Sequence, residues 1–103
     1  MFEQVSRLLG LEGFRVTDVE EHGHELELVV ELVAVAGCCP RCGRASCELK
    51  ERPVVRVRDL AVAGRRTSLR WRKRRFRCRA CGGTFTERNP ELPARQRVTR
   101  RFR

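Results

Sequence analysis

The 103-residue sequence predicts a small, mainly β domain organised around clustered cysteines, with a short helix at its N-terminus and the start of a second helix at its C-terminus. Three observations support this fold class. There are two Cys-x-x-Cys-Gly turns, and 35 residues lie between the last cysteine of the first turn and the first cysteine of the second. Several segments alternate apolar and polar residues, as strands with one solvated face do. The chain is also short enough to bury only a modest core, and many domains of this size add a metal or disulfides.

Residues 1–37 are expected to form a short helix over residues 3–9 and then an acidic β-hairpin. Gly10 follows the helix, and two β-runs lie on either side of His22-Gly23-His24. The second run has apolar residues of one parity and acidic residues of the other: Leu26, Leu28, Val30 and Leu32 against Glu25, Glu27 and Glu31. This alternation predicts one face on a core and one face in water. We expect the hairpin to pack on the cysteine-containing region, and the two histidines to lie in a solvated turn rather than bind a metal.

The cysteine spacing predicts a metal site. The two turns are Cys39-Pro-Arg-Cys42-Gly43 and Cys78-Arg-Ala-Cys81-Gly82. Two intervening residues allow both sulfurs of a turn to reach one tetrahedral ion, and the glycine permits the positive φ that closes the turn. We therefore predict a zinc ribbon over residues 38–90, with one structural Zn²⁺ bound by Cys39, Cys42, Cys78 and Cys81. Four protein ligands leave no position for a reacting water, so this site predicts no catalysis.

Other uses of the cysteines were weighed. Disulfides need an oxidising compartment, which nothing in this sequence supports. A thioredoxin-type centre uses one Cys-x-x-Cys beside a βαβ unit, which is not apparent here. Rubredoxin-like iron also uses two Cys-x-x-Cys turns, so spacing alone leaves zinc and iron open. Cys38 is adjacent to a ligand and can hardly point at the same ion, and Cys47 is expected to be a small buried thiol.

An inserted β-hairpin is expected between the two cysteine turns, with strands over residues 54–60 and 67–77. In the second strand Leu69 and Trp71 would face the core, which places Arg70, Arg72 and Arg74 on the outer face. Phe76 has the opposite parity from Trp71. A bulge or bend near residues 73–75 is therefore needed if both aromatic side chains are buried.

Charge is distributed unevenly along the chain, whose formal net charge is +10. Residues 1–37 have two arginines against eight acids, and residues 38–103 have 21 Lys or Arg against five acids. Such a basic region favours a nucleic acid as partner. The predicted contacts are Arg70, Arg72, Lys73, Arg74, Arg75, Arg97, Arg100 and Arg101. Alternatively these arginines pair with the N-terminal acids, but eight acids are too few to neutralise most of them.

No targeting segment or membrane span is predicted. The first ten residues lack a basic region followed by a long apolar stretch, and the most apolar segment, residues 26–36, contains Glu27 and Glu31. We expect a cytoplasmic protein with reduced thiols.

Three segments resemble the N-terminal part of insertion-sequence transposases of the ISL-three group: CPRCGRAS (39–46), VRDLAVAGRRTSLRWRKRRFRCRACGGTFTE (57–87) and ELPARQRVTRRFR (91–103). The resemblance implies a zinc ribbon, then a helix-turn-helix, then an RNase-H-like core with an Asp-Asp-Glu triad. Residues 91–103 would be the start of a truncated helix-turn-helix region, with Pro93 in a position to begin a helix. The partner implied is double-stranded DNA at transposon ends, in a bacterial, nucleoid-associated setting.

This chain ends before a catalytic core, so no catalytic residue is assigned and we expect a non-enzymatic fragment or remnant of a transposase. Self-association through missing regions is possible in this interpretation. Residues 94–103 are expected to be poorly ordered or an isolated short helix, because one or two helical turns without a packing partner are marginal in water. The alternative function is a standalone zinc ribbon that binds RNA or ribosomes, or a protein-interaction adaptor.

Overall fold

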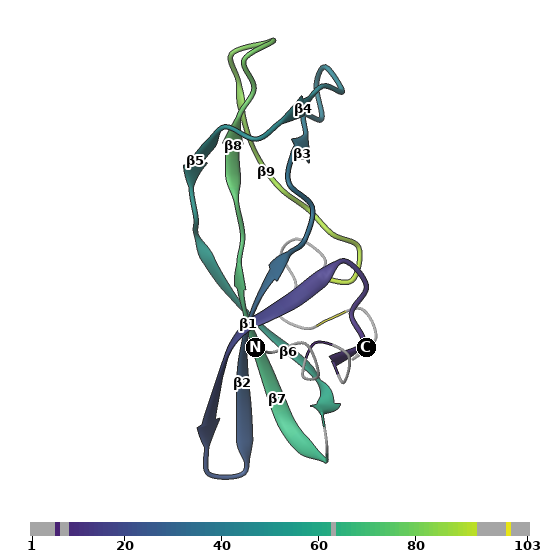
Figure 1. The fold of residues 1–103 in the computed structure, drawn as a ribbon, viewed down its shortest axis with the longest axis vertical. Helices are drawn as coiled ribbons and strands as arrows, with labels where there is room; N and C mark the ends of the chain where they lie inside the picture. The colour runs from purple at the N-terminus through teal and green to yellow at the C-terminus, as the bar shows by residue number, and fades with distance from the viewer. Residues whose placement is uncertain (1–5, 7–8, 63, 93–98, 100–103) are drawn as a thin grey trace.

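A four-stranded β-sheet at one end, and a three-stranded and a two-stranded sheet at the other, make an elongated molecule of 46 × 29 × 20 Å (Figure 1). The structure is a computed structural model that describes residues 6, 9–62, 64–92 and 99. Nine strands are formed: β1 Phe14–His22, β2 Glu25–Leu32, β3 Gly37–Cys38, β4 Ala45–Ser46, β5 Leu49–Glu51, β6 Val54–Val62, β7 Arg65–Arg72, β8 Arg75–Arg77 and β9 Thr84–Thr86.

No helix is among the elements of this described part, so the helical part of the predicted fold class is not supported. The predicted helix over residues 3–9 falls mostly on residues outside the described set. Its last residue, Leu9, is buried, and the Gly10 N–H donates to the Ser6 carbonyl oxygen at 3.2 Å. The second helical segment, residues 94–103, lies outside the described residues except for Thr99.

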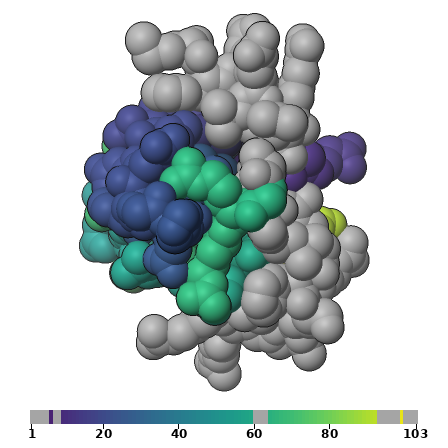
Figure 2. All heavy atoms as spheres, turned by 90° about the horizontal axis from the view of Figure 1, so that it is seen from below, coloured from purple at the N-terminus to yellow at the C-terminus, as the bar shows by residue number. Residues whose placement is uncertain are grey.

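The larger sheet has the strand order β1-β2-β7-β6. It joins two antiparallel hairpins, β1–β2 and β6–β7, through a parallel pairing of β2 with β7. Both hairpins were predicted, but the second one is not confined to the cysteine region: it completes a sheet with the N-terminal hairpin. Viewed from the end of this sheet, the blue β1–β2 hairpin lies directly against the green β7 (Figure 2).

One face of this sheet carries the main hydrophobic core. Leu28 and Val30 of β2 are fully buried against Leu69 and Trp71 of β7, which are their register partners. The Phe14 and Trp71 rings meet edge to face, with centroids 5.4 Å apart. The predicted parity of both strands is therefore confirmed for the apolar face. The acidic face is not fully in water, since Glu27 is buried.

The basic strand breaks between β7 and β8. At this break the Lys73 N–H donates to the carbonyl oxygens of Trp71 and Pro53, at 2.9 and 3.0 Å. The change of direction lets Trp71 enter the core of the large sheet and Phe76 enter that of the small one, with 1% of each residue exposed. The predicted bend near residues 73–75 is confirmed.

The smaller half contains both cysteine turns. Its three-stranded sheet has the order β5-β8-β9, and the short β3–β4 hairpin lies beside it. The core here is only Cys39, Phe76, Cys78 and Phe85. Gly37 packs so closely on the Phe76 and Phe85 rings that a Cβ there would come within 2.8 and 2.9 Å of their carbons. A core this small needs another source of stability, which a metal supplies in many domains.

Thr99 docks on the edge of the large sheet. Its N–H donates to the Arg58 carbonyl oxygen and its hydroxyl to an Asp59 carboxylate oxygen, both at 2.8 Å, and the residue is fully buried. The expectation that residues 94–103 lack a packing partner is therefore wrong at Thr99, because the buried Asp59 side chain provides an acceptor.

Candidate metal centre and basic surfaces

The two cysteine turns have the same backbone geometry. The Gly43 N–H donates to the Cys39 carbonyl oxygen at 2.8 Å, and the Gly82 N–H to the Cys78 carbonyl oxygen at 2.7 Å. Both glycines have the predicted positive φ, 73° and 76°. A side chain with a Cβ would be strained in this region, so Cys-x-x-Cys-Gly is the sequence that closes the turn without strain.

The four predicted ligands converge at the tip of the molecule. Their sulfurs all lie within 4.8 Å of one another. Across the two turns, Cys39 Sγ is 3.7 Å from Cys81 Sγ and Cys42 Sγ is 3.5 Å from Cys78 Sγ. Four sulfurs placed tetrahedrally about 2.3 Å from a zinc ion are about 3.8 Å apart, whereas a disulfide needs about 2.05 Å. The cluster therefore fits one zinc ion and not a pair of disulfides.

The electrostatics of the cluster also favour a cation. Backbone N–H groups of Cys42 and Arg41 point at the Cys39 sulfur and lower its pKa to about 6. The pKa of Cys78 is lowered chiefly by the Cys81 N–H. The Arg44 N–H lowers the pKa of Cys42, but the neighbouring Cys78 sulfur, burial and the Cys39 charge together raise it to about 11. The Cys39 and Cys78 thiols thus ionise readily, and the negative charge on Cys39 makes it harder for the Cys42 thiol to ionise as well. A bound dication would neutralise this charge and allow all four thiols to ionise.

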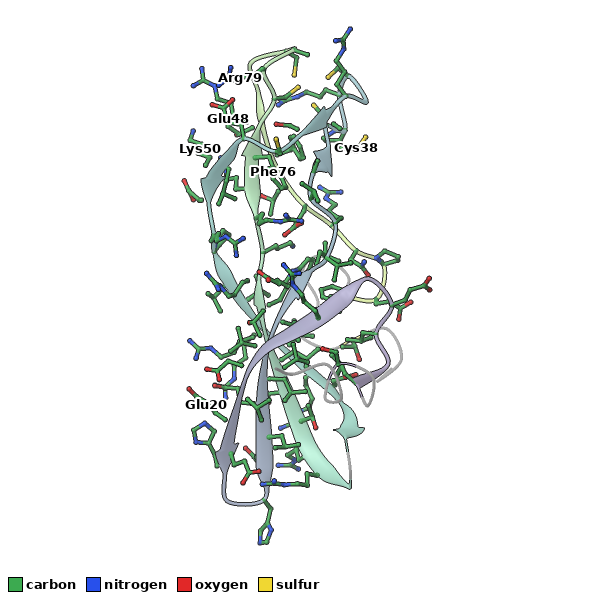
Figure 3. All side chains as sticks on the ribbon, in the orientation of Figure 1. Glu20, Cys38, Glu48, Lys50, Phe76 and Arg79 are labelled. Atoms are coloured by element: carbon green, nitrogen blue, oxygen red, sulfur yellow. The ribbon has the colours of Figure 1, made fainter. Side chains whose placement is uncertain are left out.

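The two remaining cysteines lie outside the cluster. Cys38 is exposed, its thiol donates to the Gly43 carbonyl oxygen at 3.2 Å, and its sulfur points away from the tip where the other sulfurs gather (Figure 3). The prediction that Cys47 is buried is wrong, because Cys47 is exposed. Its neighbour Ser46 takes the inward position and donates to the Arg77 carbonyl oxygen.

The predicted DNA-contacting residues do not form one exposed ladder. Arg70 is exposed but pairs with Glu27 at 3.5 Å, and Arg72 is exposed with no carboxylate partner among the described residues. Lys73 is half-buried with its Nζ 4.7 Å from the Trp71 ring centroid, and burial lowers its pKa. Arg75 is half-buried and donates to the Thr84 hydroxyl at 3.2 Å. Arg97, Arg100 and Arg101 lie outside the described residues.

Arg74 is the clearest departure. Its expected place on the outer face is wrong: the residue is 9% exposed and pairs with buried Glu87 at 2.9 Å. Because the strand bends at Lys73, Arg74 lies on the buried side with Phe76, although Arg72, two residues earlier, is exposed. Its charge is used inside the protein, which removes it from the set of candidate DNA contacts.

Acidic side chains pair with many arginines of the large sheet. Glu27 accepts from Arg56 at 2.9 Å, and Glu31 from Arg15 at 2.9 Å. The remaining pairs are Arg52–Glu31, Arg65–Glu21, Arg66–Glu25 and Arg70–Glu27. The alternative weighed from the sequence, that arginines pair with N-terminal acids, therefore holds for this sheet. Sequence parity could not show it, because it depends on β2 and β7 being neighbours.

Glu20, His22 and Glu27 form a second group of possible ligands. His22 Nε2 lies 3.3 Å from Glu20 Oε2, and both side chains are exposed. Glu27 already accepts from Arg56 and Arg70. Since its carboxylate has these partners, the group is an ion-pair network between β1 and β2.

The turns, the paired β-hairpins and the convergent sulfurs define a small mainly β zinc-ribbon domain whose four cysteines can bind one zinc. Comparison with known proteins shows which family of zinc ribbons this domain matches. Residues 36–81 match the family described as zinc-finger of transposase IS204/IS1001/IS1096/IS1165. The chain is also 36% identical over 96 residues to the transposase for insertion sequence element IS1001 of Bordetella parapertussis. Residues 36–81 thus match the zinc ribbon of that transposase family, and the sequence resemblance is confirmed.

The alignment with the IS1001 transposase includes 90% of this chain and 24% of the relative, so the chain spans about a quarter of its length. No solved structure matches the chain. In the part of the chain that the structure describes, helices of the length and apolarity needed to span a membrane are absent.

Proposed function

We propose that this chain acts as the DNA-binding zinc-ribbon module of an insertion-sequence transposase and binds the ends of its element during transposition. The observation that carries the proposal is the set of unpaired cations in a ribbon of transposase type. Of the basic residues described, those with no carboxylate partner are Arg41, Arg44, Lys50, Arg58, Arg72, Lys73, Arg75, Arg77 and Arg88. Six of these nine lie in residues 37–51 and 75–88, around the metal site.

Phosphate contacts are the binding mode that this surface favours. Arginine side chains match the geometry of phosphate oxygens and remain charged, but phosphate contacts carry no sequence information. The module therefore positions the protein on DNA, and no catalytic step is assigned to it. A DNA partner of this kind belongs in the bacterial cytoplasm, at the nucleoid.

Binding of the full chain to DNA tests the proposal. We expect affinity for a 25-base-pair duplex to fall linearly with salt on a log–log plot, with a slope of about −0.9 for each phosphate neutralised. A duplex with the terminal-repeat sequence and a shuffled duplex should bind with similar affinity if phosphates dominate. Tighter binding to a structured RNA of equal length would favour the RNA-binding alternative, and no binding to either at 50 mM salt would contradict both.

A further inference from the structure

The excess positive charge is concentrated at the metal end of the molecule. The four strands of the large sheet contain seven arginines and seven acids, so their formal charge is zero. Residues 37–51 and 75–88 contain seven basic residues and three acids, and four thiolates around one Zn²⁺ add a charge of −2, so this end keeps a formal charge of +2. One of those acids, Glu87, is already paired with Arg74, and another, Glu48, lies beside Arg79 at 2.6 Å (Figure 3). A polyanion is therefore attracted to the ribbon more than to the sheet face that holds Arg70 and Arg72.

Three arginines converge at the open edge of β9. Arg41 Nη2 donates to the Thr84 carbonyl oxygen at 3.2 Å, and Arg75 Nη2 donates to the Thr84 hydroxyl at 3.2 Å. A hollow beside them is lined by Pro40, Arg41, Thr84, Phe85, Thr86 and Arg88. No carboxylate lines it, and neither Arg41 nor Arg88 has a carboxylate partner among the residues that the structure describes.

Arg41 is directed toward this hollow rather than only toward the thiolates. Its guanidinium lies where a Cβ on Gly83 would be, so the absence of a side chain at Gly83 lets it cross the turn and reach Thr84. The Thr84 hydroxyl accepts from Arg75, which leaves its own hydrogen available to an anion. The hollow thus presents guanidinium and hydroxyl donors to a ligand, and no carboxylate in its lining competes for them.

We propose that this hollow, defined by Arg41, Thr84, Thr86 and Arg88 with Arg75 beside it, binds phosphodiester groups of duplex DNA, one at Arg41 and one at Arg88. The proposal rests on the DNA-binding function above and specifies its contact surface. Guanidinium groups form charge-assisted, often bidentate hydrogen bonds with phosphate oxygens. In this proposal the hollow, and not the outer face of β7, is the principal DNA contact, because the arginines of β7 lie in a sheet with equal numbers of arginines and acids.

The hollow is built from both cysteine turns. Arg41 lies between Cys39 and Cys42 in the first turn, whereas Thr84 follows the second turn, which ends at Gly82 and Gly83. Metal binding by both turns therefore also holds Arg41 beside Thr84. The same phosphate contacts should weaken when the metal is removed.

Two charge-matched double variants of the full chain test the proposal: Arg41→Ala with Arg88→Ala, and Arg58→Ala with Arg72→Ala. All four side chains are exposed, and each pair removes two positive charges that have no carboxylate partner among the described residues. We expect the first pair to make the log–log salt slope for a shuffled 25-base-pair duplex shallower by about 1.8, the effect of two lost phosphate contacts. The second pair should leave the slope close to that of the original chain.

Equal zinc content and unfolding midpoints would show that both variants fold. Arg88→Ala alone provides a second test, because Arg88 makes no hydrogen bond to another side chain in the described part of the chain, and it should reduce the slope by about 0.9. An unchanged slope in the first pair with a reduced slope in the second would overturn the hollow as the contact while leaving DNA binding intact. Absence of DNA binding by the original chain at 50 mM salt would overturn the proposed function and the hollow together.

Discussion

Arg74 and Glu87 form a buried, forked ion pair where the two sheets meet. Arg74 Nη2 and Nε donate to Glu87 Oε1 at 2.9 and 3.1 Å, and the Arg74 backbone N–H donates to Oε2 at 2.7 Å. Arg74 Nη2 also donates to the Ala34 carbonyl oxygen at 2.7 Å, in the segment that connects β2 to β3. One side chain therefore joins the end of β9, the start of β8 and the linker between the sheets.

Removing either partner of this pair should strongly destabilise the protein. Glu87→Gln or Arg74→Met leaves a buried charge without its counterion, which costs about 3–5 kcal/mol in the free energy of unfolding. Urea denaturation measures the change. Arg72→Met, an exposed arginine two residues away, is the control and should alter stability by less than about 0.5 kcal/mol. The double change Arg74→Met with Glu87→Leu should recover part of the loss, and equal effects of Arg74→Met and Arg72→Met would contradict the buried pair.

Metal removal should unfold one half of the molecule before the other. Among the described residues, the hydrophobic core of the ribbon has four members, whereas the large sheet has its own core of ten. Because metal binding is coupled to folding, a chelator should abolish amide-exchange protection in β8 and β9 and preserve it in β1, β2 and β7. The untreated protein should contain one zinc per chain.

The matched control for the metal is Cys47→Ser, an exposed cysteine outside the cluster, which should leave the zinc content unchanged. Cys42→Ser should lose the metal. Iron in the purified protein would show that the metal is not zinc. Zinc retained by Cys42→Ser and lost by Cys47→Ser would show that the ligand set is wrong.

Gly37→Ala should destabilise the ribbon, since the new Cβ would lie 2.8–2.9 Å from carbons of Phe76 and Phe85. Overpacking of this kind typically costs about 1–3 kcal/mol. Thermal unfolding of the zinc-bound protein measures the effect, and Phe85→Leu in the same chain should relieve part of it by making room. No loss of stability in Gly37→Ala would mean that the two rings separate without cost.

Stability should depend on pH through Glu31. Burial raises the pKa of Glu31, but hydrogen bonds and charge from Arg15 and Arg52 lower it more, so its pKa lies below the ordinary value. The stabilisation is therefore present above the unfolded-state pKa of about 4.3 and is lost as the pH falls through the folded-state pKa. Since the Arg15 side chain is 58% exposed, Glu31→Gln should cost less than about 1 kcal/mol at pH 7. Denaturant midpoints of the two proteins should converge as the pH is lowered through the folded-state pKa of Glu31; a constant difference would rule out Glu31 as the cause.

Local patterns predicted the parts of the fold that depend on local geometry. Cys-x-x-Cys-Gly spacing determines a turn whatever surrounds it, and both turns close with the expected positive φ. The opposite parity of Trp71 and Phe76 predicted the bend between them, since two buried aromatics on one straight strand require the same parity.

Predictions that depended on distant neighbours were less successful. Strict alternation from Trp71 predicted that Arg74 lies on the exposed face. The sequence did not show whether the strand bends before or after Arg74, and the bend lies before it, at Lys73. Alternation identified β2 and β7 as strands, but only their parallel pairing brings Glu27 to Arg70 and neutralises part of the basic strand. Arg41 and Arg88 are separated by 46 residues in sequence and were not singled out as a pair. Two features of the sequence could have suggested a site at Arg41: the arginine lies inside the first cysteine turn, and the segment Gly82-Gly83-Thr84 ends the second turn.

The parallel pairing of β2 with β7 also determines when this protein can fold as it is synthesised. Residues 26–30 of β2 meet partners about 41 positions later, at residues 67–71. Until those residues leave the ribosome, the β1–β2 hairpin has an unpaired edge and an uncovered apolar face, and the second cysteine turn is later still. Contacts this distant in sequence slow folding and leave aggregation-prone intermediates. The nascent chain should therefore depend on a chaperone, or on fast translation of residues 32–81, whereas the finished domain should not need a chaperone.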